Sequence, residues 1–80
     1  MTRPEDRHLV NAHAPVEIVV NGQPMTTAVA TLDRFLLENG YSEVRVATAL
    51  NGEFVPERLR SARRLNPGDR IEIVSPRQGG

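Results

Sequence analysis

The sequence predicts an α+β fold, in which one mixed β-sheet is covered on one face by a single main helix. Three observations support this prediction. Segments with alternating apolar residues occur near both ends of the chain, two Asn-Gly pairs mark tight hairpins, and only one stretch has helical apolar spacing. Eighty residues are enough for one small domain with a modest core.

The first hairpin is predicted by residues 16–27. Residues 16–20 are rich in β-branched side chains and alternate, with Ile18 at the centre of the apolar face. Asn21-Gly22 follows, and both positions of such a pair accept the positive φ of a two-residue hairpin turn. Residues 23–27 form the return strand, which we expect to be short because Pro24 has no N–H to donate to a ladder.

The helix is predicted at residues 31–40. Thr31 suits the N-cap, where its hydroxyl would accept an unpaired backbone N–H, and Asp33 suits the positive end of the helix dipole. Gly40 suits the left-handed position that ends a helix. One apolar stripe, predicted to pack onto the sheet, is formed by Leu32, Phe35 and Leu36.

The second half of the chain predicts the rest of the sheet. The expected elements are a strand at 44–50, an Asn-Gly turn at 51–52, a short strand at 53–55, a short helix or irregular arm at 57–65, a type II turn at 66–69 and a strand at 70–74. In the last strand Ile71 and Ile73 face inward. The economical packing is a β-grasp, with this strand inside the sheet. The domain organisation is then a mobile extension at 1–14, the β-grasp domain at 15–75 and a flexible tail at 76–80.

Composition excludes several classes of function. The chain has ten arginines, ten acidic residues, no lysine and no cysteine, so a lysine Schiff base, a disulfide and a thiolate metal site are excluded. Its zero net charge gives no overall attraction to nucleic acid or to a membrane. No segment resembles a signal peptide or a membrane span, so we expect a cytoplasmic protein. We also expect the free protein to be a monomer. His8 and His13 lack the acidic or thiol support of a metal site, and no metal is expected.

No internal catalytic machinery is predicted. Both histidines fall in the expected mobile extension, where neither is held against a nucleophile. The carboxylates occupy outward positions, and we expect no buried carboxylate pair. The one charge cluster predicts a solvated face or a docking surface for an acidic protein rather than a nucleic-acid site, because no aromatic residues are interleaved with Arg58, Arg60, Arg63 and Arg64. The chain is therefore interpreted as something that an enzyme acts upon.

The two final glycines are the candidate site. Gly79 and Gly80 carry the terminal carboxylate on a tip without side chains, which suits entry into another protein's active site. Five residues follow the last strand and its Ser75, and they span at most about 17 Å when extended. The tail predicted to enter the partner's active site is made of Pro76, Arg77, Gln78 and Gly79, with Gly80 at its end.

Several motifs together resemble the ThiS family of sulfur carrier proteins from thiamine biosynthesis. These are Asn-Gly-x-x-Val-Pro at 51–56, Pro-Gly-Asp at 67–69 and the final Gly-Gly at 79–80. The first hairpin and the Thr31-Leu32 helix start also fit, so the resemblance covers residues 16–80.

The resemblance implies a ubiquitin-like β-grasp fold and a defined chemistry. A ThiF-type adenylyltransferase would adenylate Gly80, using ATP and magnesium that the carrier itself does not bind. Sulfur from a cysteine desulfurase or another donor would then make a thiocarboxylate on Gly80. The thiazole synthase ThiG would take that sulfur into the thiazole ring. The chain would be a protein co-substrate, not an enzyme.

Three alternatives stay open. The small subunit of molybdopterin synthase shares the fold and the Gly-Gly end, although the Val-Pro and Glu-Ile-Val segments favour ThiS. A ubiquitin-like modifier would be found conjugated to lysines of other proteins. A protein- or RNA-binding module would keep its function without Gly79 and Gly80, and RNA binding would weaken steeply with salt.

Overall fold

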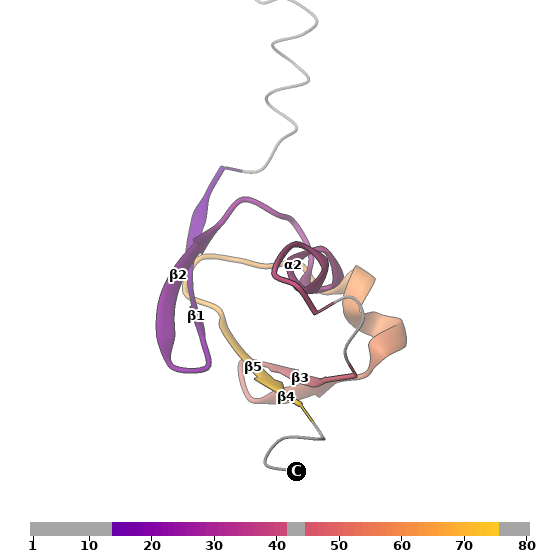
Figure 1. Cartoon of the computed structure of the whole chain (residues 1–80). Coiled ribbons are helices and arrows are strands. Elements are labelled where there is room, and N and C mark those ends of the chain that lie inside the picture. The colour runs from indigo at the N-terminus through magenta and orange to yellow at the C-terminus, as the bar shows by residue number, and fades with distance from the viewer. Residues whose placement is uncertain (1–13, 42–44, 76–80) are drawn as a thin grey trace, which may run out of the picture.

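The protein is described by a computed structural model, which places residues 14–41 and 45–75. Over these residues five strands form one mixed sheet in the order β2-β1-β5-β3-β4. Between the strands lie one α-helix and one 3-10 helix (Figure 1). The elements are β1 (Val16–Val20), β2 (Gln23–Thr27), α2 (Leu32–Glu38), β3 (Ala47–Leu50), β4 (Glu53–Val55), η1 (Glu57–Ala62) and β5 (Arg70–Val74).

Strand β5 is central in this sheet, as predicted. It pairs in parallel with β1 on one side and antiparallel with β3 on the other. The two hairpins, β1–β2 and β3–β4, flank it. In Figure 1 the sheet curves around one side of α2, so the strand that leads to the C-terminal residues runs through the middle of the domain.

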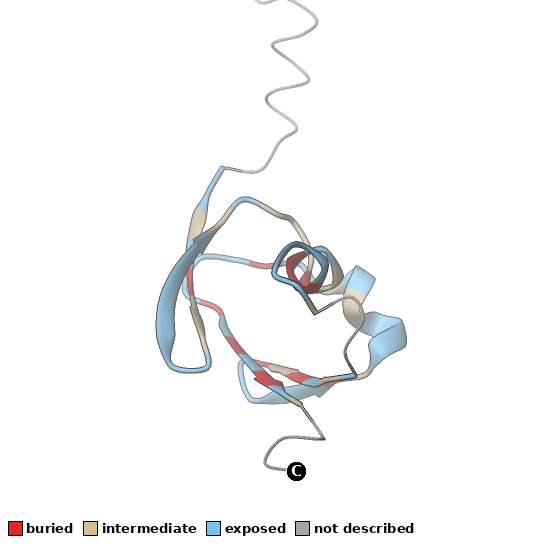
Figure 2. Ribbon diagram, viewed as in Figure 1, coloured by how far each residue is buried: buried red, intermediate tan, exposed pale blue. Residues whose placement is uncertain are grey.

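The core lies between this curved sheet and α2. Figure 2 shows buried segments of the sheet facing the buried side of the helix. The predicted apolar faces are confirmed, since Ile71 and Phe35 are almost fully buried. The cluster of buried apolar residues consists of Ile18, Leu32, Phe35, Leu36, Leu50, Val55, Leu65, Ile71 and Ile73.

The start of α2 differs from the prediction in one detail. Thr31 occupies the N-cap, but its hydroxyl donates to Asp33 Oδ1 and accepts no backbone N–H. The first N–H of the helix, that of Leu32, donates to the Arg63 carbonyl at 3.0 Å. A neighbouring bridge pairs Thr31 with Arg64, so the backbone after η1 caps this helix. At the other end Gly40 has φ +87°, which confirms the predicted left-handed stop.

Strand β3 begins at Ala47, later than the predicted 44, which lies outside the described residues. The ladder starts there because Ala47 is opposite Val74, the last residue of β5. One residue earlier, the Val46 carbonyl accepts a hydrogen bond of 2.8 Å from Arg60 Nη2. The alternatives for residues 57–65 are resolved in favour of a short 3-10 helix.

The predicted N-terminal extension and C-terminal tail fall almost wholly on residues 1–13 and 76–80, outside the described part of the chain, and their boundaries stay predictions. Among residues 14–41 and 45–75 no helix is long and apolar enough to cross a membrane.

Candidate functional site: the end of the central strand

The candidate site begins where β5 ends. Val74 closes the strand, and Ser75 is the last residue that the structure describes before the C-terminal residues. Pro76, Arg77, Gln78, Gly79 and Gly80 all lie outside the described residues, so their roles stay predictions. What the structure does describe is the base from which these residues leave the domain.

Two Asn-Gly turns bind the central strand β5, one near each of its ends. Asn21 and Gly22 have φ of 50° and 84°, and Asn51 and Gly52 have φ of 53° and 85°, as the predicted tight hairpin turns require. The sequence did not predict that both asparagine side chains also bind β5. Asn21 bonds to Ile73 near the end of the strand, and Asn51 bonds to Arg70 at its start.

Asp69 completes the support at the start of β5. Its carboxylate accepts two hydrogen bonds, one of 2.9 Å from Asn51 Nδ2 and one of 2.8 Å from the N–H of Asn66. The side chain is buried, which corrects the expectation that carboxylates occupy outward positions. Pro-Gly-Asp is therefore a turn whose last residue ties itself to the second hairpin. Only the turn could be expected from the sequence, because Asn51 lies 18 residues away.

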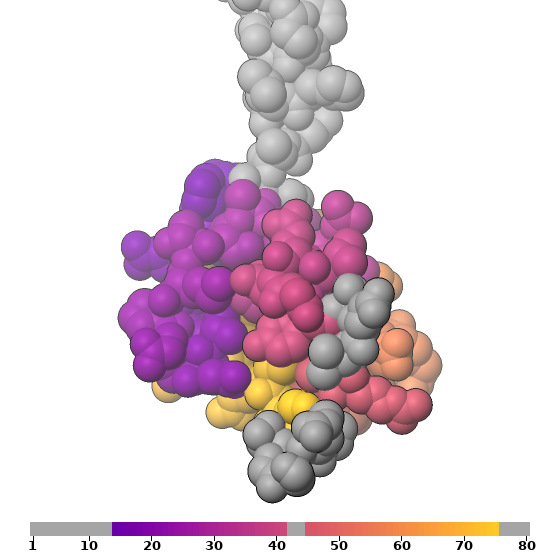
Figure 3. All heavy atoms as spheres, in the orientation of Figure 1, coloured from indigo at the N-terminus to yellow at the C-terminus, as the bar shows by residue number. Residues whose placement is uncertain are grey.

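An exposed apolar patch lies on the sheet face that α2 leaves uncovered. Register places Phe54 beside Ala49, and Ala47 beside Val74 in the next row, all on this face. The exposed Glu72 lies opposite Ala49 on its other side, so the apolar patch borders a carboxylate. Phe54 is 67% exposed and Val74 is 59% exposed. Figure 3 shows the end of β5, in yellow, reaching the molecular surface. The patch therefore extends to the last residue of β5, next to the end of the described chain.

The predicted arginine cluster does not act as one surface. Arg60 is half-buried and donates to Thr48 Oγ1 at 3.2 Å and to the Val46 carbonyl, so it fastens η1 to β3. Arg63 lies 3.5 Å from Glu53 in an ion pair. Arg58 and Arg64 are exposed. Half of the cluster therefore has intramolecular partners, which weakens the interpretation as a phosphate-contacting patch.

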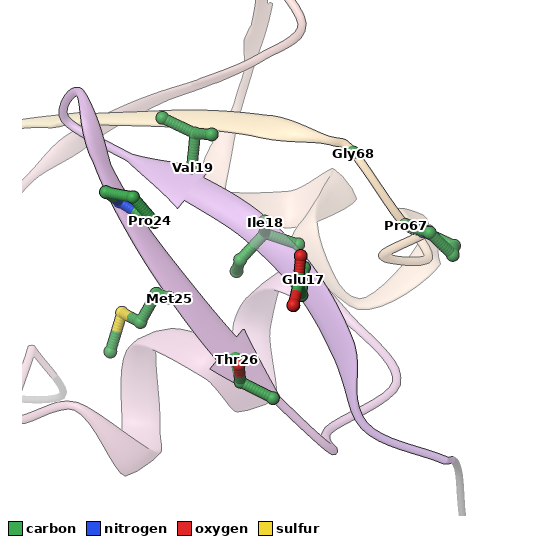
Figure 4. Close-up of a pocket in the computed structure, with 8 residues that line it drawn as sticks. All are labelled: Glu17, Ile18, Val19, Pro24, Met25, Thr26, Pro67 and Gly68. Carbon is green, nitrogen blue, oxygen red and sulfur yellow. The ribbon is translucent and has the colours of Figure 1, made fainter.

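A surface hollow of about 440 Å³ lies at the other end of β5. Figure 4 shows that its walls come from the β1–β2 hairpin and from the turn before β5, including Glu17, Met25 and Pro67. Gly68 also lines it, and this residue precedes β5, whereas the C-terminal residues leave after Val74. The hollow is therefore separated from the C-terminal end of β5 by the length of that strand. Among the described residues no cluster of three or more His, Cys, Asp or Glu side chains is arranged to hold a metal.

Comparison with known proteins shows the family. The sequence profile of the ThiS family matches residues 9–80. The chain belongs to the ThiS family.

Two curated proteins and one solved structure are also similar to this chain. The uncharacterized protein ycf40 of Pyropia yezoensis is 32% identical over 69 residues, which cover 85% of this chain and 97% of that protein. Its counterpart in Porphyra purpurea is 30% identical over 66 residues, covering 81% and 93%. The crystal structure of the thiamine biosynthesis protein ThiS from Geobacter metallireducens superposes with a TM-score of 0.69 at 26% identity, covering 81% of this chain and all of that one.

The ThiS likeness confirms the predicted ubiquitin-like β-grasp fold. As a ThiS family member the chain is a small sulfur carrier protein rather than an enzyme. The geometry is consistent with that role, since β5, which leads to the C-terminal residues, is held at the centre of the sheet and its last residue, Val74, belongs to the apolar patch.

Proposed function

We propose that this ThiS family member carries sulfur as a thiocarboxylate on Gly80 and donates it to the synthesis of the thiamine thiazole. The observation that carries the proposal is the family match, which extends through the final Gly-Gly to residue 80. The likeness to a thiamine biosynthesis protein supports the choice of pathway.

The first step activates the terminal carboxylate. An α-carboxyl group has a pKa of about 3.3–3.7, so near neutral pH it is ionised and a poor electrophile. A ThiF-type adenylyltransferase, with ATP and magnesium, would let one carboxylate oxygen of Gly80 attack the α-phosphorus of ATP. Pyrophosphate leaves, and the product is an acyl adenylate.

The second step introduces sulfur. The terminal sulfur of a persulfide made by a cysteine desulfurase would displace AMP at the carbonyl carbon and form an acyl disulfide, which a donor thiol then reduces to the thiocarboxylate as that thiol becomes a disulfide. Another source could supply hydrosulfide, which would displace AMP directly without a reductant. AMP carries away the bonding electron pair, and the terminus becomes C(=O)S⁻, which is itself a nucleophile. Because the chain has no cysteine or lysine, it offers no internal thiol or lysine amine to trap the acyl adenylate. ThiG would then take the sulfur into the thiazole ring.

The folded domain presents this terminus to its partners. We infer that the activating enzyme covers the apolar patch of Ala47, Ala49, Phe54 and Val74, because an enzyme that receives the residues after Ser75 must approach the surface from which they leave. An exposed aromatic side chain beside small aliphatic ones suits the core of such an interface.

The decisive experiment is intact mass spectrometry of the protein purified from its source cells, followed by fragmentation. The expected result is a chain that ends at Gly80 and has one oxygen replaced by sulfur on that residue. A chain lacking Gly79 and Gly80 serves as the control and should acquire no sulfur. A mature chain that continues past Gly80, or one that carries its sulfur elsewhere, would contradict the proposal.

A second measurement tests the pathway. Thiocarboxylated protein is incubated with ThiG and its co-substrates, and in parallel with the large subunit of molybdopterin synthase. Transfer of sulfur to thiazole is expected. Transfer only to the molybdopterin precursor would keep the carrier chemistry and refute the thiamine assignment.

A further inference from the structure

The last part of β5 lies beyond the reach of its parallel neighbour. Strand β1 pairs with β5 only at Val19↔Arg70 and Val20↔Ile71, and then turns away into β2. The N–H of Asn21 still reaches the Ile71 carbonyl at 2.9 Å. The next backbone groups along this edge of β5 are those of Ile73, and the β1 strand has already ended opposite them.

The side chain of Asn21 takes the place of the missing strand. The N–H of Ile73 donates to Asn21 Oδ1 at 2.8 Å, and Asn21 Nδ2 donates to the Ile73 carbonyl at 3.2 Å. A carboxamide has the same donor and acceptor as a peptide group, so it continues the ladder by one step. Ile73 itself is buried, and its backbone groups would otherwise lack this pairing near the core.

The position of Ile73 gives this contact a functional meaning. Ile73 lies two residues before Ser75, which follows β5 and is the last described residue. Without the Asn21 amide, the end of β5 would be held only along its β3 edge. Its last residues would then fray more often, and docking of the C-terminal residues in a partner would have to order more of the chain.

We propose that Asn21 is a positioning residue for delivery of the C-terminal glycine to the activating enzyme, an inference that rests on the proposed function. The described partners of Asn21 lie on β5, and we assign it no part in the chemistry at Gly80. It fixes the base from which the C-terminal residues extend, so that less conformational entropy is lost when the partner binds them.

The chain contains a matched control in its second Asn-Gly turn. Asn51 has nearly the same φ as Asn21, and it also binds β5 through its carboxamide. Its Oδ1 accepts a hydrogen bond of 2.9 Å from the N–H of Arg70. Arg70 is the first residue of β5, at the opposite end of the strand from Val74. Asn21→Gly and Asn51→Gly therefore remove the same group from the same kind of turn, and glycine keeps the positive φ in both.

The first measurement is amide hydrogen exchange by NMR on the full-length chain. In Asn21→Gly the Ile73 amide is expected to exchange about tenfold faster or more than in the wild type, while the Arg70 amide stays protected. Asn51→Gly is expected to show the reverse pattern. Unchanged exchange at Ile73 in Asn21→Gly would overturn the inference, whatever the function of the protein.

The second measurement is the steady-state rate of adenylation by a ThiF-type adenylyltransferase, with the carrier as the varied substrate. Asn21→Gly is expected to raise KM for the carrier about fivefold, with kcat unchanged within about twofold. Asn51→Gly is expected to keep the wild-type KM even if its melting temperature falls as far. Equal KM effects in the two variants would show that general stability is responsible and would overturn the inference.

A third variant, with a smaller change at position 21, tests the same contact if Asn21→Gly does not fold. Asn21→Asp keeps the acceptor for the Ile73 N–H but loses the amide donor, so Ile73 protection and KM should lie between those of the wild type and of Asn21→Gly. Values for Asn21→Asp outside that interval would contradict the inference. If the wild-type chain is not adenylated at all, the proposed function is wrong, while the exchange data still decide whether Asn21 anchors the end of β5.

Discussion

The buried carboxylate of Asp69 gives the sharpest stability prediction. Asp69→Ala removes the acceptor for two donors, the N–H of Asn66 and the Nδ2 of Asn51. A hydrogen bond to a charged group contributes about 1.5–3 kcal/mol, but Asn51 and Asn66 are both exposed, and water replaces part of each bond. We therefore expect a loss of about 2–3 kcal/mol in the free energy of unfolding, below the roughly 3–6 kcal/mol that two such bonds at full strength would give.

That loss is large for a domain of this size. At about 0.05–0.15 kcal/mol per residue, the 59 described residues imply a total stability of about 3–9 kcal/mol. The melting temperature is expected to fall by about 10–20 °C, since each kcal/mol corresponds to about 4–8 °C in small domains. The assay is urea and thermal unfolding followed by far-ultraviolet circular dichroism, because the chain has no tryptophan to report by fluorescence.

The control for this prediction is Glu72→Ala. Glu72 is an exposed carboxylate on the outer face of β5, and its removal should change stability by less than about 0.5 kcal/mol. A double-mutant cycle with Asn51→Gly isolates the Asn51–Asp69 bond. The double variant should be more stable than the sum of the single effects implies, by about 1 kcal/mol. An Asp69→Ala loss no greater than that of Glu72→Ala would refute the reasoning.

Three further predictions concern the tip, the patch and the edge of the sheet. Gly80→Ala should leave the melting temperature unchanged and lower kcat for adenylation or sulfur transfer about tenfold or more, because a methyl group crowds attack at the terminal carbon; a normal thiocarboxylate yield would contradict this steric argument. Phe54→Gln should raise KM for the carrier in adenylation about five- to thirtyfold, because the interface loses an aromatic anchor. The control Leu59→Gln, on η1, should leave KM unchanged. Similar KM values for both variants would show that the activating enzyme does not bind the patch. Pro24→Thr should increase self-association of the chain in sedimentation or light scattering, because it gives the free edge of β2 a backbone N–H. Val19 donates its N–H toward β5, so the backbone of its β2 partner, Pro24, faces away from β1 at that edge. Unchanged association would show that Pro24 does not protect this edge.

Local patterns in the sequence predicted most of the fold. Alternation predicted the inward faces of the strands, and Asn-Gly predicted both hairpin turns, because each signal depends on neighbours within a few residues. The inward placement of Ile71 and Ile73 needed only the period of a strand. These signals agree with one another, which is why one arrangement of a helix on a mixed sheet accommodated all of them.

The features that the sequence did not reveal depend on partners distant along the chain. The Asn21 amide binds Ile73, which is 52 residues away, and no local pattern distinguishes a turn asparagine that does this from one that does not. At the start of α2, the N–H of Leu32 is bound by the carbonyl of the distant Arg63, while the Thr31 hydroxyl donates to Asp33. Strand β3 starts at Ala47 because its neighbour β5 ends there. In each case the tertiary partner decided the local structure.

In the proposed function, recognition and chemistry are divided between two parts of this chain, and the division is testable. The folded domain would contribute recognition through the patch near Phe54 and order at the end of β5 through Asn21, while the chemistry would take place at Gly80. Substitutions there remove binding interactions that are present before and during the reaction, so they should raise KM and leave kcat unchanged. A substitution at Gly80 alters the reacting carbon itself and should lower kcat. A carrier whose domain variants lowered kcat instead would use its folded part in the chemistry, and the separation argued from these contacts would be wrong.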